Sequence, residues 1–128
     1  MNPQDQKILI IDDDDRNIFA LKAVLRVRGF SCLVAVNGLQ AMEILQQQKD
    51  IGAALVDMMM PGMDGYELME LVRRTASLDH VRLIAVTAQA MMGDKEKCLA
   101  AGADGYIPKP VDIDNLLNIL DGLLKQRG

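Results

Sequence analysis

Aromatic residues are scarce in this chain of 128 residues, which contains two phenylalanines, two tyrosines and no tryptophan. Half of the residues are nonetheless hydrophobic, so the core must consist of Ile, Leu, Val, Met and Ala. A chain of this length corresponds to one domain and can bury a substantial core. We expect a single domain over residues 1–128, with its folded core over residues 7–124.

Cysteine and histidine are also rare, with two cysteines and one histidine in the whole chain. Cys32 and Cys98 lie in apolar segments and do not form a CxxC motif. This pattern favours reduced, buried thiols over a disulfide or a zinc site, so the sequence does not indicate redox chemistry. His80 falls in a polar turn, where we expect a surface position rather than a ligand or relay role.

Long basic runs and long apolar runs are missing as well. Arg73 and Arg74 form the longest basic run, and 14 basic against 18 acidic residues give a net charge of -4. Nucleic acid and anionic membranes are bound by clustered cations, so we expect this chain alone to bind neither. The apolar runs are far shorter than the roughly 20 residues of a membrane span, and residues 1–6 are too polar for a signal peptide. We therefore expect a cytoplasmic protein.

The sequence does contain a regular alternation of strand-length and helix-length segments. Asn37 and Asp64 are expected helix N-caps because Gln40 and Glu67 follow three residues later, and Gly29 is an expected helix end. The expected helices cover residues 16–28, the segments after Asn37 and after Asp64, and residues 91–101 and 112–125. The expected strands cover residues 8–11, 32–36, 53–56, 83–86 and 105–107.

Three of these helices carry further signals. For the first helix, Asp15 is the expected N-cap and Asp14 a solvated loop residue. Asp112 is the expected N-cap of the last helix. The fourth segment includes Gly93 and few strongly apolar residues, so we expect its packing to be the least stable of the five and any movement to occur there.

Five alternations of strand and helix predict a parallel sheet with helices on both faces and right-handed crossovers. Pro108 ends the last strand segment, and proline is tolerated at strand ends and on edge strands. The fold class that satisfies both points is α/β, a flavodoxin-like (βα)5 doubly wound architecture with a five-stranded parallel sheet of order 2-1-3-4-5.

Reactive side chains follow the strand segments. An acidic run starts at Asp12 after the first strand, Asp57 follows the third, Thr87 the fourth and Lys109 the fifth, after a proline. The carboxyl ends of parallel strands share one edge, and the crevice between the first and third strands is the expected ligand site, so Asp12, Asp13 and Asp57 should meet there. Three clustered carboxylates need either a cation or a protonated member, and hard oxygen ligands suit Mg²⁺. Lys109 and Thr87 would then supply a cation and a hydrogen-bond donor to a phosphoryl group near Asp57.

Four motifs occur in a fixed order along the chain: KILIIDDDD at residues 7–15, ALVDMMMPGMDG at 54–65, IAVTA at 84–88 and GADGYIPKP at 102–110. Together they are highly specific, and over nearly the whole chain the sequence resembles the receiver domain of two-component response regulators. Residues 12–21 and 85–112 most resemble receivers attached to hybrid sensor histidine kinases.

The resemblance implies a phosphoacceptor module whose own chemistry is limited to self-phosphorylation and autodephosphorylation. Asp57 would accept the phosphoryl group from a phosphohistidine of a partner protein. Mg²⁺, with Mn²⁺ as an alternative, would be bound by the side chains of Asp13 and Asp57 and by the backbone carbonyl of Met59. Asp12 would hold a metal-bound water.

The resemblance also implies a conformational switch. Thr87 and Lys109 would contact the acquired phosphoryl oxygens, and Tyr106 would rotate inward as Thr87 moves toward the phosphate. The peptide bond between Lys109 and Pro110 is a candidate cis bond. The implied partners are a sensor histidine kinase or a histidine phosphotransfer protein, and a downstream protein that contacts the fourth helix, fifth strand and fifth helix. The oligomeric state stays open, although charged and apolar residues on the fourth and fifth helices could pair in a phosphorylation-dependent homodimer.

Two alternatives remain at this stage. One is a metal-dependent phosphohydrolase of the haloacid-dehalogenase type. Such enzymes carry an aspartyl nucleophile in a DxD motif after the first strand, and Asp12 and Asp14 could form such a motif. The sequence has no second-domain insertion of the kind such enzymes carry, and Asp57 would have no role in one. The other is a pseudo-receiver that only binds partners, which the presence of every titratable residue of the site disfavours.

Overall fold

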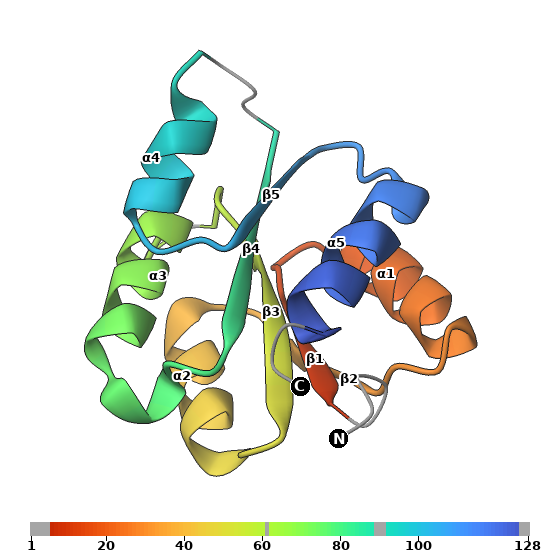
Figure 1. Cartoon of the computed structure of the whole chain (residues 1–128), viewed down its shortest axis with the longest axis horizontal. Coiled ribbons are helices and arrows are strands. Elements are labelled where there is room, and N and C mark those ends of the chain that lie inside the picture. Colours follow the sequence, from red (N-terminus) through yellow and green to blue (C-terminus); the bar gives the residue numbers. More distant parts are fainter. Residues whose placement is uncertain (1–5, 61, 89–91, 126–128) are drawn as a thin grey trace.

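Five parallel strands form one sheet in the order β2-β1-β3-β4-β5 (Figure 1). The structure is a computed structural model that describes residues 6–60, 62–88 and 92–125. The order confirms the predicted flavodoxin-like topology, and β5 lies at an edge of the sheet as Pro108 predicts. The strands are β1 (Lys7–Ile11), β2 (Cys32–Ala35), β3 (Ile51–Asp57), β4 (Arg82–Thr87) and β5 (Gly105–Pro108).

Helices cover both faces of the sheet. In Figure 1, α1 and α5 lie on one side of the sheet and α2, α3 and α4 on the other. All seven residues of β3 are buried, as expected for a central strand of a parallel sheet with both faces covered. The helices are α1 (Asp15–Val27), α2 (Gly38–Gln47), α3 (Gly65–Arg74), α4 (Asp94–Ala100) and α5 (Ile113–Lys125), with a short 3-10 helix η2 (Ala76–Leu78) before β4.

The two faces of β1 belong to two separate hydrophobic clusters. Leu9 and Ile11 pack into the larger cluster with residues of α2 and α3, whereas Ile8 and Ile10 pack against residues of α1 and α5. This division follows from the alternation of side chains along a strand, and it fixes the register of β1 between β2 and β3. None of the described helices is long and apolar enough to cross a membrane.

Three of the predicted N-caps are confirmed. The Asn37 carboxamide accepts a hydrogen bond from the Gln40 N–H at 2.8 Å, and the Asp64 carboxylate accepts one from the Glu67 N–H at 2.9 Å. Asp112 caps α5 by accepting from the N–H of the second helical residue at 3.0 Å. Gly29 follows the end of α1 with a φ of 92°, a conformation that glycine adopts without strain.

The prediction of the α1 cap was wrong by one residue. Asp14 is the N-cap, and its carboxylate accepts a hydrogen bond from the Arg16 N–H at 2.9 Å, while Asp15 is the first residue of the helix. The reason lies in Asp12, whose Oδ1 accepts the N–H of Asp14 at 2.9 Å. That contact accompanies an extended backbone at Asp14, which is the conformation an N-cap needs.

The fourth helix is shorter than predicted and excludes Gly93. Gly93 lies just before α4 with a φ of 89°, and the first part of the predicted segment, at Met91, lies outside the described residues. Cys98 is the only fully buried residue of α4, which fits the expectation of sparse packing; movement of this helix stays a prediction. Cys32 is half-buried rather than buried, because its strand β2 lies at the other edge of the sheet.

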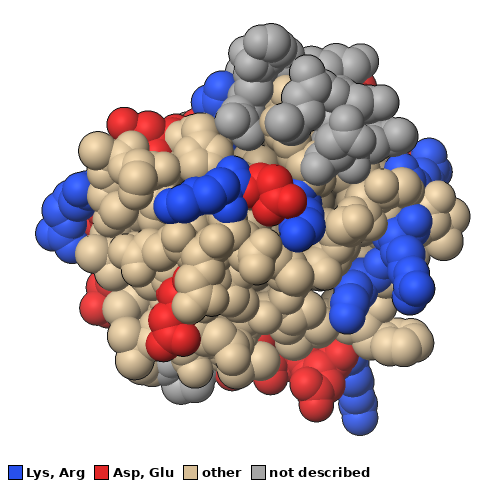
Figure 2. Space-filling view, turned by 90° about the horizontal axis from the view of Figure 1, so that it is seen from below, with Lys and Arg blue, Asp and Glu red and all other residues tan. Residues whose placement is uncertain are grey.

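Charged side chains of both signs are intermixed on the face at the amino ends of the strands (Figure 2). One of the contacts at this end is the ion pair of Lys7 Nζ with Asp50 Oδ2, at 3.2 Å. Among the described residues that Figure 2 shows, positive charge does not form the continuous surface that nucleic acid binding needs.

Arg73 of α3 connects three segments at the start of β4 and β5. Its guanidinium donates to the carbonyls of Val81 and Gly102, both at 3.0 Å, and to Asp104 Oδ2 at 2.6 Å. Asp104 Oδ2 also accepts the N–H of Leu83 at 2.9 Å. This network holds the chain that enters β5, the strand that carries Tyr106 and leads into Lys109.

We predict that Arg73→Met lowers the free energy of unfolding by about 2 kcal/mol, because two carbonyls and one carboxylate lose their donor. Urea denaturation followed by circular dichroism measures this value. Arg74→Met is the matched control, since Arg74 is the exposed neighbour on the same helix. An equal, small loss in both variants would contradict a stabilising role of the network.

Candidate functional site

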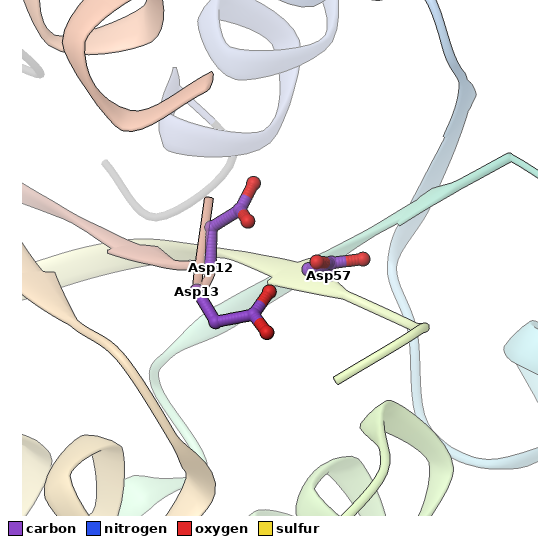
Figure 3. Close-up of side chains that lie close together, drawn as sticks. All are labelled: Asp12, Asp13 and Asp57. Atoms are coloured by element: carbon purple, nitrogen blue, oxygen red, sulfur yellow. The ribbon is translucent and has the colours of Figure 1, made fainter. Parts of the chain in front are cut away.

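Three carboxylates converge at the carboxyl ends of β1 and β3. Asp12 and Asp13 directly follow β1, Asp57 ends β3, and their side chains approach one another in Figure 3. One carboxylate oxygen of each lies within 4.8 Å of the others. β1 and β3 are neighbours in the sheet, with Ile11 paired with Val56, so the crevice is where the topology predicts it.

Burial makes it unfavourable for all the carboxylates of this cluster to be ionised. Asp12 and Asp57 are 3% and 4% exposed, whereas Asp13 is exposed. Burial raises the pKa of Asp12, and the nearby Asp57 raises it further, against the opposing effects of the Asp14 N–H and of Lys109. The folded chain therefore disfavours the ionised form of Asp12, which is the expected result of placing like charges together in a poorly solvated site.

The donor set fits a hard divalent cation. All three groups offer carboxylate oxygens, and backbone donors already orient two of them: Asp12 accepts the Asp14 N–H, and Asp57 Oδ1 accepts the Met59 N–H at 3.1 Å. Burial is the main cause of the raised Asp12 pKa, and a cation of charge +2 would offset both the burial of the charge and its repulsion by Asp57. Oxygen-only clusters of this size suit Mg²⁺ better than softer metals.

Lys109 supplies a positive charge to the cluster. Its Nζ lies 3.4 Å from Asp57 Oδ1, and a quarter of its side chain is exposed. The Lys109 N–H donates to the carbonyl of Thr87 at 2.7 Å, which anchors the lysine to the end of β4. One ammonium thus faces three carboxylates, so the cluster keeps a net negative charge when all of them are ionised.

Thr87 reaches the same edge of the sheet from β4. It is 2% exposed, and it follows Val86, the residue that pairs with Asp57 across β3 and β4. The sequence prediction that the residues after β1, β3, β4 and β5 gather at one edge is therefore correct for Asp12, Asp13, Asp57, Thr87 and Lys109. The functional roles of these residues are proposals that follow below.

The loop after Asp57 contains the methionine run. Met58 and Met60 are buried and belong to the larger hydrophobic cluster, whereas the side chain of Met59 is 53% exposed. Packing therefore accounts for Met58 and Met60, and Met59 is connected to the site through its backbone. Gly65 at the start of α3 leaves room for Met58, because a Cβ there would collide with the Met58 side chain.

Two further predictions concern the segment around β5. The peptide bond between Lys109 and Pro110 is cis, as the resemblance implied. Tyr106 is half-buried on β5, and its hydroxyl donates to Asp94 Oδ2 at 3.1 Å. The sequence analysis did not identify Asp94 or its second phenol partner, Tyr66, because neither residue stands in a pattern that predicts a long-range contact.

Comparison with known proteins identifies the family. The model of the response regulator receiver domain matches residues 8–121. The hybrid signal transduction histidine kinase I of Dictyostelium discoideum is 34% identical over 122 residues, which are 91% of this chain and 7% of that protein. The response regulator MprA of Mycobacterium sp. (strain KMS) is 32% identical over 120 residues, which are 94% of this chain and 51% of that protein. The chain thus spans only part of the length of these two relatives.

A solved structure agrees in fold and sequence. The receiver domain of a sensor histidine kinase from Pseudomonas aeruginosa PAO1, solved with a magnesium ion coordinated in its active site cleft, superposes with a TM-score of 0.85 at 33% identity. The alignment covers 94% of this chain and 98% of that one.

The fold and the site together define a flavodoxin-like α/β signalling module with an acidic cluster at the carboxyl edge of its sheet. The chain belongs to the response regulator receiver domain family of two-component systems. This result supports the receiver interpretation over the haloacid-dehalogenase-type hydrolase and over the pseudo-receiver.

We predict that Asp12→Asn raises the free energy of unfolding by about 1 kcal/mol at neutral pH without divalent ions, because it removes a charge that is buried and is also repelled by Asp57. The folded pKa of Asp12 lies above its unfolded value, so its ionisation lowers stability. The gain should be complete above the folded pKa and should vanish as the pH falls below the unfolded pKa, where wild-type Asp12 is protonated in both states.

Urea titrations in the presence of a chelator at several pH values measure this gain. The matched control is Asp15→Asn, an exposed acid in the first turn of α1 outside the cluster. Asp15 interacts favourably with the helix N-terminus, so its loss should lower stability slightly. A loss of stability at neutral pH in Asp12→Asn would show that repulsion is not the largest contribution of Asp12 to stability.

Proposed function

We propose that this chain accepts a phosphoryl group on Asp57 from a phosphohistidine of a partner protein. An Asp57 carboxylate oxygen attacks phosphorus, a P–O bond forms, the P–N bond breaks, and the imidazole nitrogen keeps the electron pair. The observation that carries the proposal is the position of Asp57, which belongs to the carboxylate cluster and also lies 3.4 Å from the Lys109 ammonium.

The cluster would hold Mg²⁺, with Mn²⁺ as the alternative of similar ligand preference. Asp13 and Asp57 would bind it through side chains, Met59 through its backbone carbonyl, and Asp12 through a bound water. When bound, the ion supplies positive charge that neutralises the cluster and coordinates a phosphoryl oxygen. The similar receiver domain from Pseudomonas aeruginosa, which coordinates magnesium in its active site cleft, supports this assignment.

Thr87 and Lys109 would bind the phosphoryl oxygens that Asp57 acquires. The Lys109 ammonium already lies beside Asp57, so it needs little movement to reach a group attached there. The Thr87 hydroxyl is a donor at the neighbouring strand end, and burial keeps it from solvent. Charge-assisted hydrogen bonds from these two groups would stabilise the developing charge of the transferred phosphoryl group.

Phosphorylation would then act as a conformational signal. The added group is nearly doubly negative, so it draws Thr87 and Lys109 toward Asp57 and biases the segment that follows β4. Tyr106 would rotate toward the position that Thr87 leaves. The chemistry of the chain itself would be limited to self-phosphorylation from small donors and autodephosphorylation.

The partners of this reaction would be a sensor histidine kinase, a histidine phosphotransfer protein, or both, acting in the cytoplasm. The similarity to a hybrid histidine kinase supports a phosphorelay of this kind. A downstream protein would bind α4, β5 and α5, where a depression of about 600 Å³ is lined by residues such as Lys95, Tyr106 and Asn118. A phosphorylation-dependent homodimer would use the same face.

We predict that acetyl phosphate adds one phosphoryl group to the wild-type chain in a magnesium-dependent reaction, and that Asp57→Asn abolishes the adduct. Intact mass spectrometry measures the adduct, and its loss on treatment with hydroxylamine identifies an acyl phosphate. Asp15→Asn, which makes the same change of charge near the site, should react like the wild type.

The outcomes of this experiment separate the alternatives. An adduct that survives in Asp57→Asn would place the nucleophile elsewhere, for example at Asp12. A folded wild-type chain that forms no adduct would support a partner-binding pseudo-receiver. Sustained turnover of a generic phosphate ester would support a phosphohydrolase.

We also predict that millimolar Mg²⁺ raises the midpoint of thermal unfolding of the wild type, because the ion binds the folded cluster and not the unfolded chain. Asp13→Asn should lose most of this increase, since it removes one carboxylate ligand and leaves the buried pair intact. Differential scanning calorimetry with Mg²⁺ and with a chelator measures the effect, and Asp15→Asn should keep the full increase. Equal increases in all three proteins would contradict the assignment of Asp13 as a ligand.

A further inference from the structure

The two tyrosines of the chain share one carboxylate. Tyr66 of α3 donates its hydroxyl to Asp94 Oδ1 at 2.6 Å, and Tyr106 of β5 donates its hydroxyl to Asp94 Oδ2 at 3.1 Å. Asp94 is the first residue of α4, so a single side chain connects α3, α4 and β5. Along the chain, Tyr66 lies 28 residues and Tyr106 lies 12 residues from Asp94.

The surroundings of Asp94 make this connection more than a surface contact. Asp94 and both tyrosines are half-buried, and the Lys97 ammonium lies 4.4 Å from the centre of the Tyr66 ring. The contact with Asp94 is the main reason that the pKa of the Tyr66 hydroxyl is raised. The pKa of Tyr106 is also raised, mainly by burial and to a smaller extent by its contact with Asp94. Both phenols therefore remain protonated donors at neutral pH.

The contact is important for α4 because this helix has little else to hold it. Cys98 is the only fully buried residue among its seven, and Gly93 precedes it in a left-handed conformation. A short helix with one buried side chain gains little from hydrophobic packing. The hydrogen bonds to Asp94 therefore add to the few contacts that position its first turn.

In its outward orientation Tyr106 is half-buried, with its ring packed against the larger hydrophobic cluster and its hydroxyl bonded to Asp94. Its side chain lines the depression between α4, β5 and α5, together with residues of α4 such as Lys95 and Leu99. A rotation of the ring toward Thr87 would break its bond to Asp94 Oδ2. The shorter bond from Tyr66 to Asp94 Oδ1 would survive that rotation, because it does not involve β5.

We propose that Asp94 is a positioning residue that restrains Tyr106 in its outward orientation, with Tyr66 as the fixed anchor of the carboxylate. The inference rests on the proposed function, because it assigns regulation to the phosphoryl site. Asp94 sets how readily the chain adopts the arrangement that phosphorylation favours. Tyr66 keeps the carboxylate in place, so the restraint re-forms when the phosphoryl group leaves.

Thermodynamic linkage gives the expected effect on the site. A restraint that opposes the phosphorylated arrangement weakens the binding of anything that stabilises that arrangement, and its removal strengthens binding by the same factor. Beryllium trifluoride with Mg²⁺ is a suitable probe because it mimics an aspartyl phosphate. Loss of one charge-assisted hydrogen bond should tighten its binding about three- to tenfold.

The experiment uses the full chain labelled with ¹³C at the Cζ atoms of tyrosine, which yields one signal each for Tyr66 and Tyr106. We expect Asp94→Asn to shift both signals before any ligand is added, and beryllium trifluoride to bind this variant about three- to tenfold more tightly than the wild type. Asp114→Asn is the matched control, because it removes the same charge from the first turn of α5 at an exposed position. Its affinity should equal that of the wild type.

A double-mutant cycle tests whether Asp94 acts through Tyr106. Tyr106→Phe should tighten binding by itself, and Asp94→Asn should then have little further effect in the Tyr106→Phe background. A purely structural role of Asp94 would instead make the two effects additive, which would overturn the inference.

The remaining outcomes are also decisive. Unchanged or weaker binding by a folded Asp94→Asn variant, when the wild type binds the probe, would overturn the restraint and leave the proposed function intact. A wild type that neither binds the probe nor forms an adduct at Asp57 would remove the proposed function and the inference with it.

Discussion

Repulsion among three carboxylates at the carboxyl ends of β1 and β3 is the constraint on which the rest of this structure depends. Asp12 and Asp57 are almost fully buried beside each other and beside Asp13, an arrangement that is unfavourable unless a cation compensates it. Lys109 compensates it only in part, from 3.4 Å. This imbalance is the basis of the proposal that the site binds a divalent ion and a phosphoryl group.

The sheet and its edges hold that cluster in place. Parallel pairing of β1 with β3 brings Asp12 next to Asp57, and the pairing of β4 with β3 and β5 brings Thr87 and Lys109 to the same edge. The hydrophobic clusters on both faces fix the register of the central strands, because a shift by one residue would move every apolar side chain to the other face. Cys98 is the one buried residue of α4, the helix that follows β4 along the chain. The proposed switch would act on this sparsely packed helix.

Most of the fold and the acidic cluster could be predicted from the sequence, because each depends on local patterns. Strand-length apolar runs followed by reactive residues placed Asp12 and Asp57 correctly, and the alternation of elements together with Pro108 at the end of the last strand led to the strand order. The α1 cap was misassigned because Asp12, a tertiary site residue, accepts the N–H of Asp14 and so shifts the helix start. The contact of Asp94 with both tyrosines could not be predicted, because no periodicity or motif connects residues that meet only after α3, α4 and β5 have packed. Local sequence patterns thus predicted the residues of the acidic site, whereas the contacts between α3, α4 and β5 could be found only in the structure.

The central claim is that Asp57 is the residue of the acidic cluster that accepts the phosphoryl group. Its most direct test is to locate the modification in the chain: phosphorylate the protein with acetyl phosphate and Mg²⁺, reduce the acyl phosphate with borohydride, and sequence the peptides by tandem mass spectrometry. Reduction converts a phosphorylated aspartate to homoserine. We predict homoserine at position 57 and at no other aspartate; homoserine at position 12 or 13, with position 57 unchanged, would contradict the account.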